Sequence, residues 1–242
     1  MQRMGEIYFQ VDWKKCPRGC GREAMKLYDE TQCWDCFNEE RRIAESQRKL
    51  GEYLRKTIGP YGIERYAFGN FETSPNNSLA FENACAFDHR RDSLLLMGPC
   101  GTGKTHLAGA ILKKCAAENI EAVWANPIWL ARQFRMRTRE EEEALLHRYA
   151  TVPVFIVDDL GVGKDTEFSL GKLYEIIGYR INDKRFGAVL TSNLSLDDMQ
   201  KKFGDDRLTS RLSGHCRVYE VGGPDMRLRM AMAQGQYEWR RR

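Results

Sequence analysis

The sequence has 242 residues, of which 42% are hydrophobic and 30% charged, and its formal net charge at neutral pH is +4. These values are typical of a soluble globular protein with room for one well-buried domain and a small additional module. No apolar run approaches the roughly 18 residues of a membrane span, and Glu6 and Asp12 interrupt the segment where a secretory signal peptide would be apolar. We therefore expect a cytoplasmic protein with no membrane partner.

Four of the eight cysteines are close together near the N-terminus, as Cys16, Cys20, Cys33 and Cys36. Two close pairs separated by a short segment supply the four soft ligands of a tetrahedral zinc site. So small a region cannot bury enough apolar surface to fold unaided, and a bound metal would supply the missing stability. We predict one Zn²⁺ on these cysteines; an iron–sulfur cluster and free thiols in a disordered tail are the alternatives.

A largely polar helix is expected after the cysteines. Ile43, Leu50, Leu54 and Ile58 recur along it at helical spacing. The turn-forming sequence GPYG at residues 59–62 ends the pattern. We predict a zinc-binding module with its connecting helix over residues 1–60 and a second domain over residues 61–242.

In the second domain, short apolar runs alternate with helical stretches. The predicted strands cover residues 93–98, 121–126, 152–159, 187–193 and 216–221. The predicted helices cover residues 105–119, 128–136, 140–150 and 169–183. Strands that alternate with helices favour an α/β domain whose parallel sheet is flanked by helices on both faces.

The first predicted strand leads into the sequence GPCGTGKTH, which satisfies the pattern GxxxxGK[ST] of a phosphate-binding loop. In such a loop, backbone N–H groups surround the β-phosphate of a nucleoside triphosphate. Lys104 is expected to reach the β- and γ-phosphates, and the Thr105 hydroxyl to ligate Mg²⁺. The predicted nucleotide-binding residues are Gly98, Pro99, Cys100, Gly101, Thr102, Gly103, Lys104, Thr105 and His106.

Acidic and amide side chains follow two of the later strands. Asp158 and Asp159 end the apolar run VFIV. Asp158 is expected to hold Mg²⁺ through water, and Asp159 to orient and polarise the attacking water. Asp159 is one methylene shorter than the glutamate more usual at that position. Asn193 follows the next strand and is expected to contact the γ-phosphate, although alone it reads equally well as a turn asparagine.

Two arginines near the C-terminal end of the domain, Arg207 and Arg211, are four residues apart and so share one helix face. Either can be an arginine finger aimed at the γ-phosphate of a neighbouring subunit. Either can equally pair with Asp205 and Asp206, and the spacing alone does not decide between these interpretations.

The order of these motifs resembles the AAA+ ATPases, and within them the DnaC-type replicative helicase loaders and the related IstB transposition ATPases. The matching segments are GPCGTGKTHLAGAI, VPVFIVDDLG, YEIIGYRINDKRFGAVLTSNLS, DDRLTSRL and PDMR. The resemblance covers about residues 61–227. No NKxD guanine motif is present and no arginine-rich lid follows the sheet, so GTPases and small-molecule kinases fit poorly.

The resemblance implies an AAA+ P-loop ATPase core, with a parallel five-stranded sheet and no full lid domain, because residues 222–242 are too few for one. It implies slow, DNA-stimulated ATP hydrolysis with Asp159, Asn193 and Arg211 as catalytic residues. Arg211 would act on the ATP of an adjacent subunit, which requires self-association through the ATP site. Arg227 matches a terminal arginine of the family in a position to contact the nucleotide.

The function implied is loading of a hexameric replicative helicase onto single-stranded DNA in replication initiation, with the zinc module docking the helicase. One alternative is an IstB-like transposition ATPase acting on DNA with a transposase. Another is a zinc-dependent nucleic-acid-binding adaptor that ATP switches. The DNA surface would be a basic helix, because cations and an aromatic ring suit a single strand. Its residues are Arg132, Phe134, Arg135 and Arg137, of which Phe134 fits the core equally well.

Overall fold

A computed structural model describes residues 14–15, 20, 23–24, 33, 35–42, 44–45, 48, 52, 65–118, 120–135, 137–161, 166–182, 187–203 and 206–234. The chain divides into two compact units, Met1–Glu52 and Tyr53–Arg242. The domain boundary expected at residues 59–62 lies outside the described residues. Among the residues that are described, no helix has both the length and the apolar character needed to cross a membrane.

The first unit contains a short hairpin and the beginning of a helix. Strands β1 (Lys14–Lys15) and β2 (Glu23–Ala24) pair antiparallel. A helical segment over residues 35–42 starts just after Cys33, whose carbonyl accepts a hydrogen bond of 3.0 Å from the Phe37 N–H. The four apolar positions from which the connecting helix was predicted, Ile43, Leu50, Leu54 and Ile58, lie outside the described residues.

The second unit is built on a five-stranded parallel sheet in the order β4-β5-β6-β3-β7. Its strands are β3 (Leu94–Met97), β4 (Ala122–Ala125), β5 (Val154–Leu160), β6 (Gly187–Ser192) and β7 (Arg217–Glu220). All five predicted strands are confirmed. Because the strands are parallel, their carboxyl ends meet at one edge of the sheet, which is the usual ligand edge of such folds.

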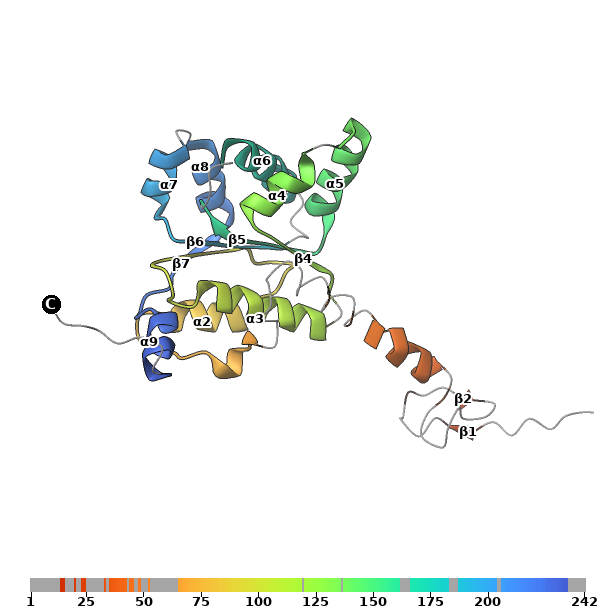
Figure 1. Ribbon diagram of the computed structural model, residues 1–242. Coiled ribbons are helices and arrows are strands. Elements are labelled where there is room, and N and C mark those ends of the chain that lie inside the picture. The colour runs from red at the N-terminus through yellow and green to blue at the C-terminus, as the bar shows by residue number, and fades with distance from the viewer. Residues whose placement is uncertain are drawn as a thin grey trace, which may run out of the picture. The chain divides into compact units, whose positions relative to one another are not determined.

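Helices cover both faces of this sheet (Figure 1). On one face lie α4 (Pro127–Phe134), α5 (Arg139–Thr151), α6 (Thr166–Asn182), α7 (Leu196–Phe203) and α8 (Asp206–His215). On the other face lie α2 (Ser78–Cys85), α3 (Lys104–Ala117) and α9 (Met226–Ala233). The predicted α/β class with helices on both faces is confirmed.

Local sequence signals account for the positions of α4 and α5. The Asn126 side chain accepts a 2.7 Å hydrogen bond from the Trp129 N–H, and Pro127 occupies the first turn of α4. Thr138 and Glu141 form a reciprocal capping box at the start of α5. Such caps satisfy N–H groups that the first turn leaves without a helical partner. They fix the residue at which each helix begins.

A buried arginine, Arg180 on α6, joins α5 to the beginnings of β5 and β6. Its Nη1 donates to the carbonyls of Tyr149, Ala150 and Val152 at 2.8–3.2 Å, and its Nη2 donates to two further carbonyls, one of them Gly187. Burial lowers the pKa of this guanidinium to about 9. A cation among carbonyls at the end of a helix is also favoured by the helix dipole. Arg180 thus fixes the amino-terminal edge of the sheet, while the opposite edge carries the site.

Candidate functional site

The loop between β3 and α3 has a backbone that requires glycine. Gly98 and Gly103 have φ values of 140° and 105°. A Cβ on Gly98 would lie 2.5 Å from the Val221 carbonyl oxygen, and one on Gly103 would lie 2.6 Å from the Phe71 ring. The left-handed backbone and these close approaches exclude a side chain at either position. The close approach of Val221 and Phe71, two segments distant in the chain, therefore constrains the conformation of the predicted phosphate loop.

Lys104, the first residue of α3, is 4% exposed and turns its ammonium back into the loop. Its Nζ donates to the carbonyl oxygens of Gly98 and Pro99 at 2.8 and 2.5 Å. Burial lowers the pKa of this lysine, whereas Cys100, Asp159 and Asp158 act in the opposite direction. The loop carbonyls thus hold a buried cation at the helix N-terminus, where a phosphate would bind.

Asp158 on β5 connects the loop to the sheet. Its Oδ1 accepts a 3.0 Å bond from the Thr105 hydroxyl and a 2.7 Å bond from the Thr191 hydroxyl. Burial, and then the charge of Asp159, raise the pKa of Asp158 to about 6. The donor set fits Mg²⁺, which prefers hard oxygen ligands. The Thr105 oxygen can offer a lone pair to the ion while its O–H still donates to Asp158. Ion binding would therefore not require the hydrogen bond between Thr105 and Asp158 to break.

Asp159 has a backbone conformation that is uncommon outside glycine, with φ at 60°. Its N–H donates to the Thr191 hydroxyl at 2.9 Å, and the pairing of β5 with β6 shifts register between Val157 and Leu160. The charge of Asp159 acts on both Asp158 and Lys104. The structure therefore brings both acids to the loop.

Thr191 was missed by sequence reasoning, because a threonine inside a strand looks like an ordinary β-former.

Asn193 lies next to the start of the phosphate loop. It is half-buried and directly follows β6, whose last residue Ser192 accepts a 3.2 Å bond from the Gly98 N–H through its carbonyl. This position agrees with the expected contact with a γ-phosphate. The contact itself stays a prediction.

The N-terminus of α9 also lies against the phosphate loop. The Met226 N–H donates to the Gly101 carbonyl at 3.0 Å, and the Asp225 side chain caps the helix. The positive charge of Arg227 acts on Asp158, lowering its pKa, and on Lys104. The field of Arg227 thus reaches Asp158 and Lys104, and its contact with the nucleotide stays a prediction.

The His106 side chain packs against the segment that precedes α2. Its Nε2 lies 2.9 Å from the Ala67 carbonyl oxygen, and its ring meets those of Tyr66 and Phe71 edge-on at 5.6 and 5.4 Å. Burial lowers the pKa of His106, consistent with a neutral ring. Because the side chain makes these contacts, the prediction that His106 binds the nucleotide concerns its backbone N–H. The side chain links the nucleotide helix to the upstream segment.

Arg211 and Arg207 share one face of α8, as predicted, and that face meets α6 of the same chain. The Arg211 guanidinium stacks on the Tyr174 ring, 3.7 Å from its centroid, and its Nη1 donates to the Tyr174 carbonyl at 3.3 Å. Gly178 makes room for it, because a Cβ there would lie 2.5 Å from Nη1. The Arg207 guanidinium lies 5.9 Å from the same ring. The finger role stays a prediction, and it would require Arg211 to leave this stack.

The predicted DNA surface needs one correction. Phe134 is 2% exposed and belongs to the core, with its ring 6.0 Å from that of Tyr149. Because its ring is buried, Phe134 does not present a surface on which a base can stack, and its assignment to a DNA surface was wrong. The three arginines predicted with it are exposed; these are Arg132, Arg135 and Arg137.

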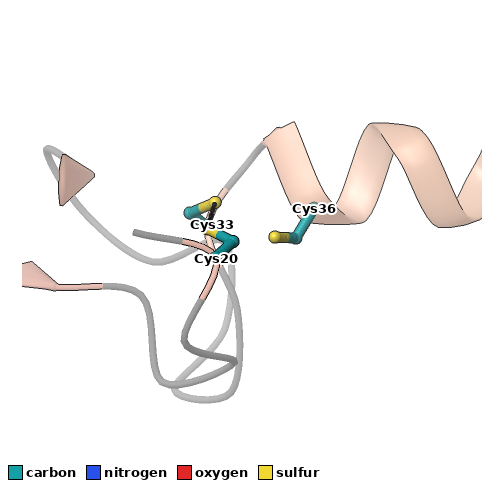
Figure 2. Close-up of side chains that lie close together, drawn as sticks. All are labelled: Cys20, Cys33 and Cys36. Atoms are coloured by element: carbon teal, nitrogen blue, oxygen red, sulfur yellow. Dashed lines mark hydrogen bonds between the residues drawn. The ribbon is translucent and has the colours of Figure 1, made fainter. Parts of the chain in front are cut away.

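Three of the four predicted metal ligands come together in the first unit (Figure 2). The Sγ atoms of Cys20, Cys33 and Cys36 all lie within 4.8 Å of one another, and those of Cys20 and Cys33 are 3.9 Å apart. Tetrahedral zinc with Zn–S bonds of about 2.3 Å separates its sulfurs by about 3.8 Å. The arrangement therefore fits a thiolate-bound metal, and zinc stays a prediction. Cys16 lies outside the described residues.

Comparison with known sequences finds relatives of two kinds. The profile of a family described as IstB-like ATP binding protein matches residues 29–233. The insertion sequence IS5376 putative ATP-binding protein of Geobacillus stearothermophilus is 30% identical over 149 residues, which cover 60% of this chain and 59% of that protein. The chain thus spans less than two thirds of this relative. The replicative helicase loader DnaC of Escherichia coli (strain K12) is 28% identical over 197 residues, which cover 76% of this chain and 80% of the loader.

Solved structures share the fold. The crystal structure of the DnaC helicase loader has a TM-score of 0.57 and 20% identity, and covers 66% of this chain and 98% of that one. The replication initiator DnaA bound to AMPPCP and single-stranded DNA has a TM-score of 0.59 and 20% identity, covering 72% and 56%. These likenesses confirm the predicted AAA+ P-loop ATPase fold.

Asp158→Asn is expected to stabilise the protein free of metal and nucleotide at pH 7.5 by about 3 kcal/mol, because folding disfavours the charged carboxylate. The pKa in the folded protein, about 6, lies above the ordinary 3.8, so the wild-type protein loses stability as the pH rises between these values. The advantage of asparagine should therefore shrink at pH 5. Thermal unfolding in EDTA at both pH values measures it.

Asp197→Asn, at an exposed position on α7, is the matched control for this experiment and should change little at either pH. An equal effect of Asp158→Asn at pH 5 and 7.5 would show that the buried charge is not the cause.

The cysteine cluster predicts one zinc ion per chain in the purified protein, measured by elemental analysis. Cys33→Ser and Cys36→Ser should each remove the zinc, because a thiolate ligand is lost. Cys85→Ser, in the second unit, should retain it. Stoichiometric iron, or a folded protein without metal, would contradict the zinc assignment.

Proposed function

Because the chain belongs to the family of IstB-like ATP binding proteins, we propose that it hydrolyses ATP and thereby loads a hexameric replicative helicase onto single-stranded DNA. The observation that carries the ATPase part is the convergence of Lys104, Thr105 and Asp158 at the carboxyl edge of the sheet. The helicase part rests on the match to the DnaC loader, which spans 80% of that protein, whereas the matches to three insertion-sequence proteins span 59%, 70% and 71% of theirs.

In the proposed mechanism, the phosphates of ATP replace the loop carbonyls as partners of Lys104. Thr105 and Asp158 would hold Mg²⁺, and the bound ion would neutralise charge on the β- and γ-phosphates. Asp159 orients the attacking water, and Asn193 contacts the γ-phosphate. The backbone of the glycine loop needs little rearrangement, because packing against Val221 and Phe71 already determines it.

A finger supplied by a neighbouring subunit completes the site in this proposal. Arg211 is the better candidate by its resemblance to the family motif, and its guanidinium must leave the Tyr174 ring to reach another chain. Stacking on an exposed or half-exposed ring is worth about 0.5–1 kcal/mol. A charge-assisted hydrogen bond from Arg211 to a phosphate is stronger than that. When subunits assemble on DNA, this bond can therefore offset the loss of stacking on Tyr174.

DNA is proposed to bind on the exposed arginines of α4 and the residues after it. Arg132, Arg135 and Arg137 are the candidates. A related fold, that of DnaA, has been solved with single-stranded DNA, which supports this class of partner. The cysteine module, residues 1–60, is proposed to dock the helicase.

A transposition ATPase is the second candidate function, and the family match together with the insertion-sequence relatives favours it. In that case the protein would act with a transposase on duplex DNA. Both candidates share the ATP site and differ in the DNA form and the protein partner.

The proposed function predicts slow ATP hydrolysis that single-stranded DNA stimulates and that Lys104→Ala abolishes. Replacing Arg132, Arg135 and Arg137 together by alanine should reduce the stimulation at least tenfold and leave basal hydrolysis unchanged. Stimulation should also weaken steeply with salt, since phosphate contacts release counterions. The matched control is Arg90→Ala with Arg91→Ala, two exposed arginines on the loop before β3.

Two outcomes would favour the second candidate over helicase loading. One is far stronger stimulation by duplex than by single-stranded DNA. The other is a pull-down in which full-length protein retains a transposase and no hexameric replicative helicase. Loss of helicase binding in full-length Cys33→Ser protein, with ATP binding intact, would support docking through the cysteine module.

A mixing experiment tests the shared active site. Lys104→Ala and Arg211→Ala proteins should each be nearly inactive, the finger variant by on the order of 10³-fold. Mixed on single-stranded DNA they should regain partial activity, because some interfaces combine an intact loop with an intact arginine. Arg207→Ala is the matched control and should stay active. No recovery at any ratio, with assembly on DNA confirmed, would contradict the finger role of Arg211.

A further inference from the structure

The Thr191 hydroxyl lies between the backbone N–H of Asp159 and the carboxylate of Asp158. Thr191 is on β6 and is 0% exposed. Its Oγ1 donates to Asp158 Oδ1 at 2.7 Å and accepts from the Asp159 N–H at 2.9 Å. This one buried oxygen therefore donates its proton to Asp158 and accepts the N–H of Asp159 with a lone pair.

The contact with Asp159 lies where the regular pairing of β5 with β6 is interrupted. The β5–β6 pairing runs in register from Val154 to Val157 and resumes shifted at Leu160. Asp159 lies in this interruption with φ at 60°, a conformation that persists only where the surroundings hold it. Its N–H is satisfied by a side chain of the neighbouring strand. Thr191 thus stabilises the local backbone that determines where the Asp159 carboxylate begins.

The contact with Asp158 fixes the carboxylate that faces Thr105. Because Thr191 and Thr105 both donate to Oδ1, they hold this side chain from the sheet and from the nucleotide helix at once. A carboxylate held by two donors loses less freedom when a cation binds, which strengthens binding. Removal of one donor would leave the buried carboxylate less stabilised in its charged form.

We propose that Thr191 is a positioning residue of the ATP site, whose hydroxyl holds Asp158 ready for Mg²⁺ and Asp159 ready for the attacking water. The inference rests on the proposed ATPase function. Thr191 thereby contributes to metal binding by holding Asp158, and to turnover by holding Asp159.

Two pairs of variants isolate the hydroxyl. Threonine and valine have nearly the same shape, with a hydroxyl in one and a methyl group in the other, and the variants Thr191→Ser and Thr191→Ala differ only by the presence of the hydroxyl. If Thr191 serves only to fill space, valine should behave like threonine, and serine should be worse. If the hydroxyl positions the acids, valine should fail and serine should work. Should the valine variant not fold, the serine–alanine pair carries the same test.

The readout is the strengthening of binding of a fluorescent ATP analogue by Mg²⁺, measured on full-length protein with and without the ion. We expect wild-type and Thr191→Ser proteins to show the full strengthening. Thr191→Val and Thr191→Ala should lose about tenfold of it, with binding in EDTA unchanged and kcat reduced at least tenfold. A general structural defect would instead weaken binding equally with and without Mg²⁺, and that result would overturn the proposal.

Equal Mg²⁺ effects and equal kcat within each pair would overturn it as well. Absence of hydrolysis in wild-type protein would overturn the proposed ATPase function, and the binding measurement would then still decide whether Thr191 holds Asp158 for the ion.

Discussion

The site depends on the two hydrogen bonds that converge on Oδ1 of Asp158, one from Thr105 and one from Thr191. Thr105 belongs to the helix that follows the glycine loop, and Thr191 belongs to β6, so a single carboxylate oxygen connects the nucleotide helix to the sheet. Burial and the charge of Asp159 raise the pKa of this carboxyl, which means that the structure holds a charged group where water stabilises it poorly. A cation at this position would relieve that cost.

The topology explains why these residues meet although they are far apart in the chain. In the order β4-β5-β6-β3-β7, β6 separates the strand that carries the acids from the strand that leads into the loop. β6 therefore contributes to both sides: Thr191 contacts the acids, and the Ser192 carbonyl accepts the Gly98 N–H. The segment after β7 adds a further contact, because the Met226 N–H donates to the Gly101 carbonyl. The charge of Arg227, in the same segment, lowers the pKa of Asp158. Two segments distant in the chain, β6 and the segment after β7, thus contact the loop directly.

Sequence patterns predict the parts of this structure that depend on local chemistry. Strands β3, β4, β5 and β6 were recognised because buried parallel strands appear as short apolar runs. The loop was recognised because its glycines and Lys104 have a defined spacing. Phe134 was misassigned although a signal was present: it lies one helical turn after Leu130, and both are buried. α9 was also missed, although Asp225 is a typical N-cap residue.

Other features depend on tertiary contacts and had no local signal. The role of Thr191 follows from the shifted register between β5 and β6, which no spacing in either strand reveals. The stacking of Arg211 on Tyr174 depends on how α6 and α8 pack, and on the absence of a side chain at Gly178. In the cysteine cluster the spacing was informative, because Cys20, Cys33 and Cys36 do converge.

A crystal structure with Mg²⁺ and a non-hydrolysable ATP analogue tests the central claim most directly, namely that the acids and the glycine loop form one ATP site. The account predicts that Thr105 Oγ1 ligates the ion while still donating to Asp158, that Thr191 keeps both of its bonds, and that Lys104 Nζ has moved from the Gly98 and Pro99 carbonyls to phosphate oxygens. A nucleotide bound away from the loop, or an Asp158 side chain turned away from both threonines, would contradict it.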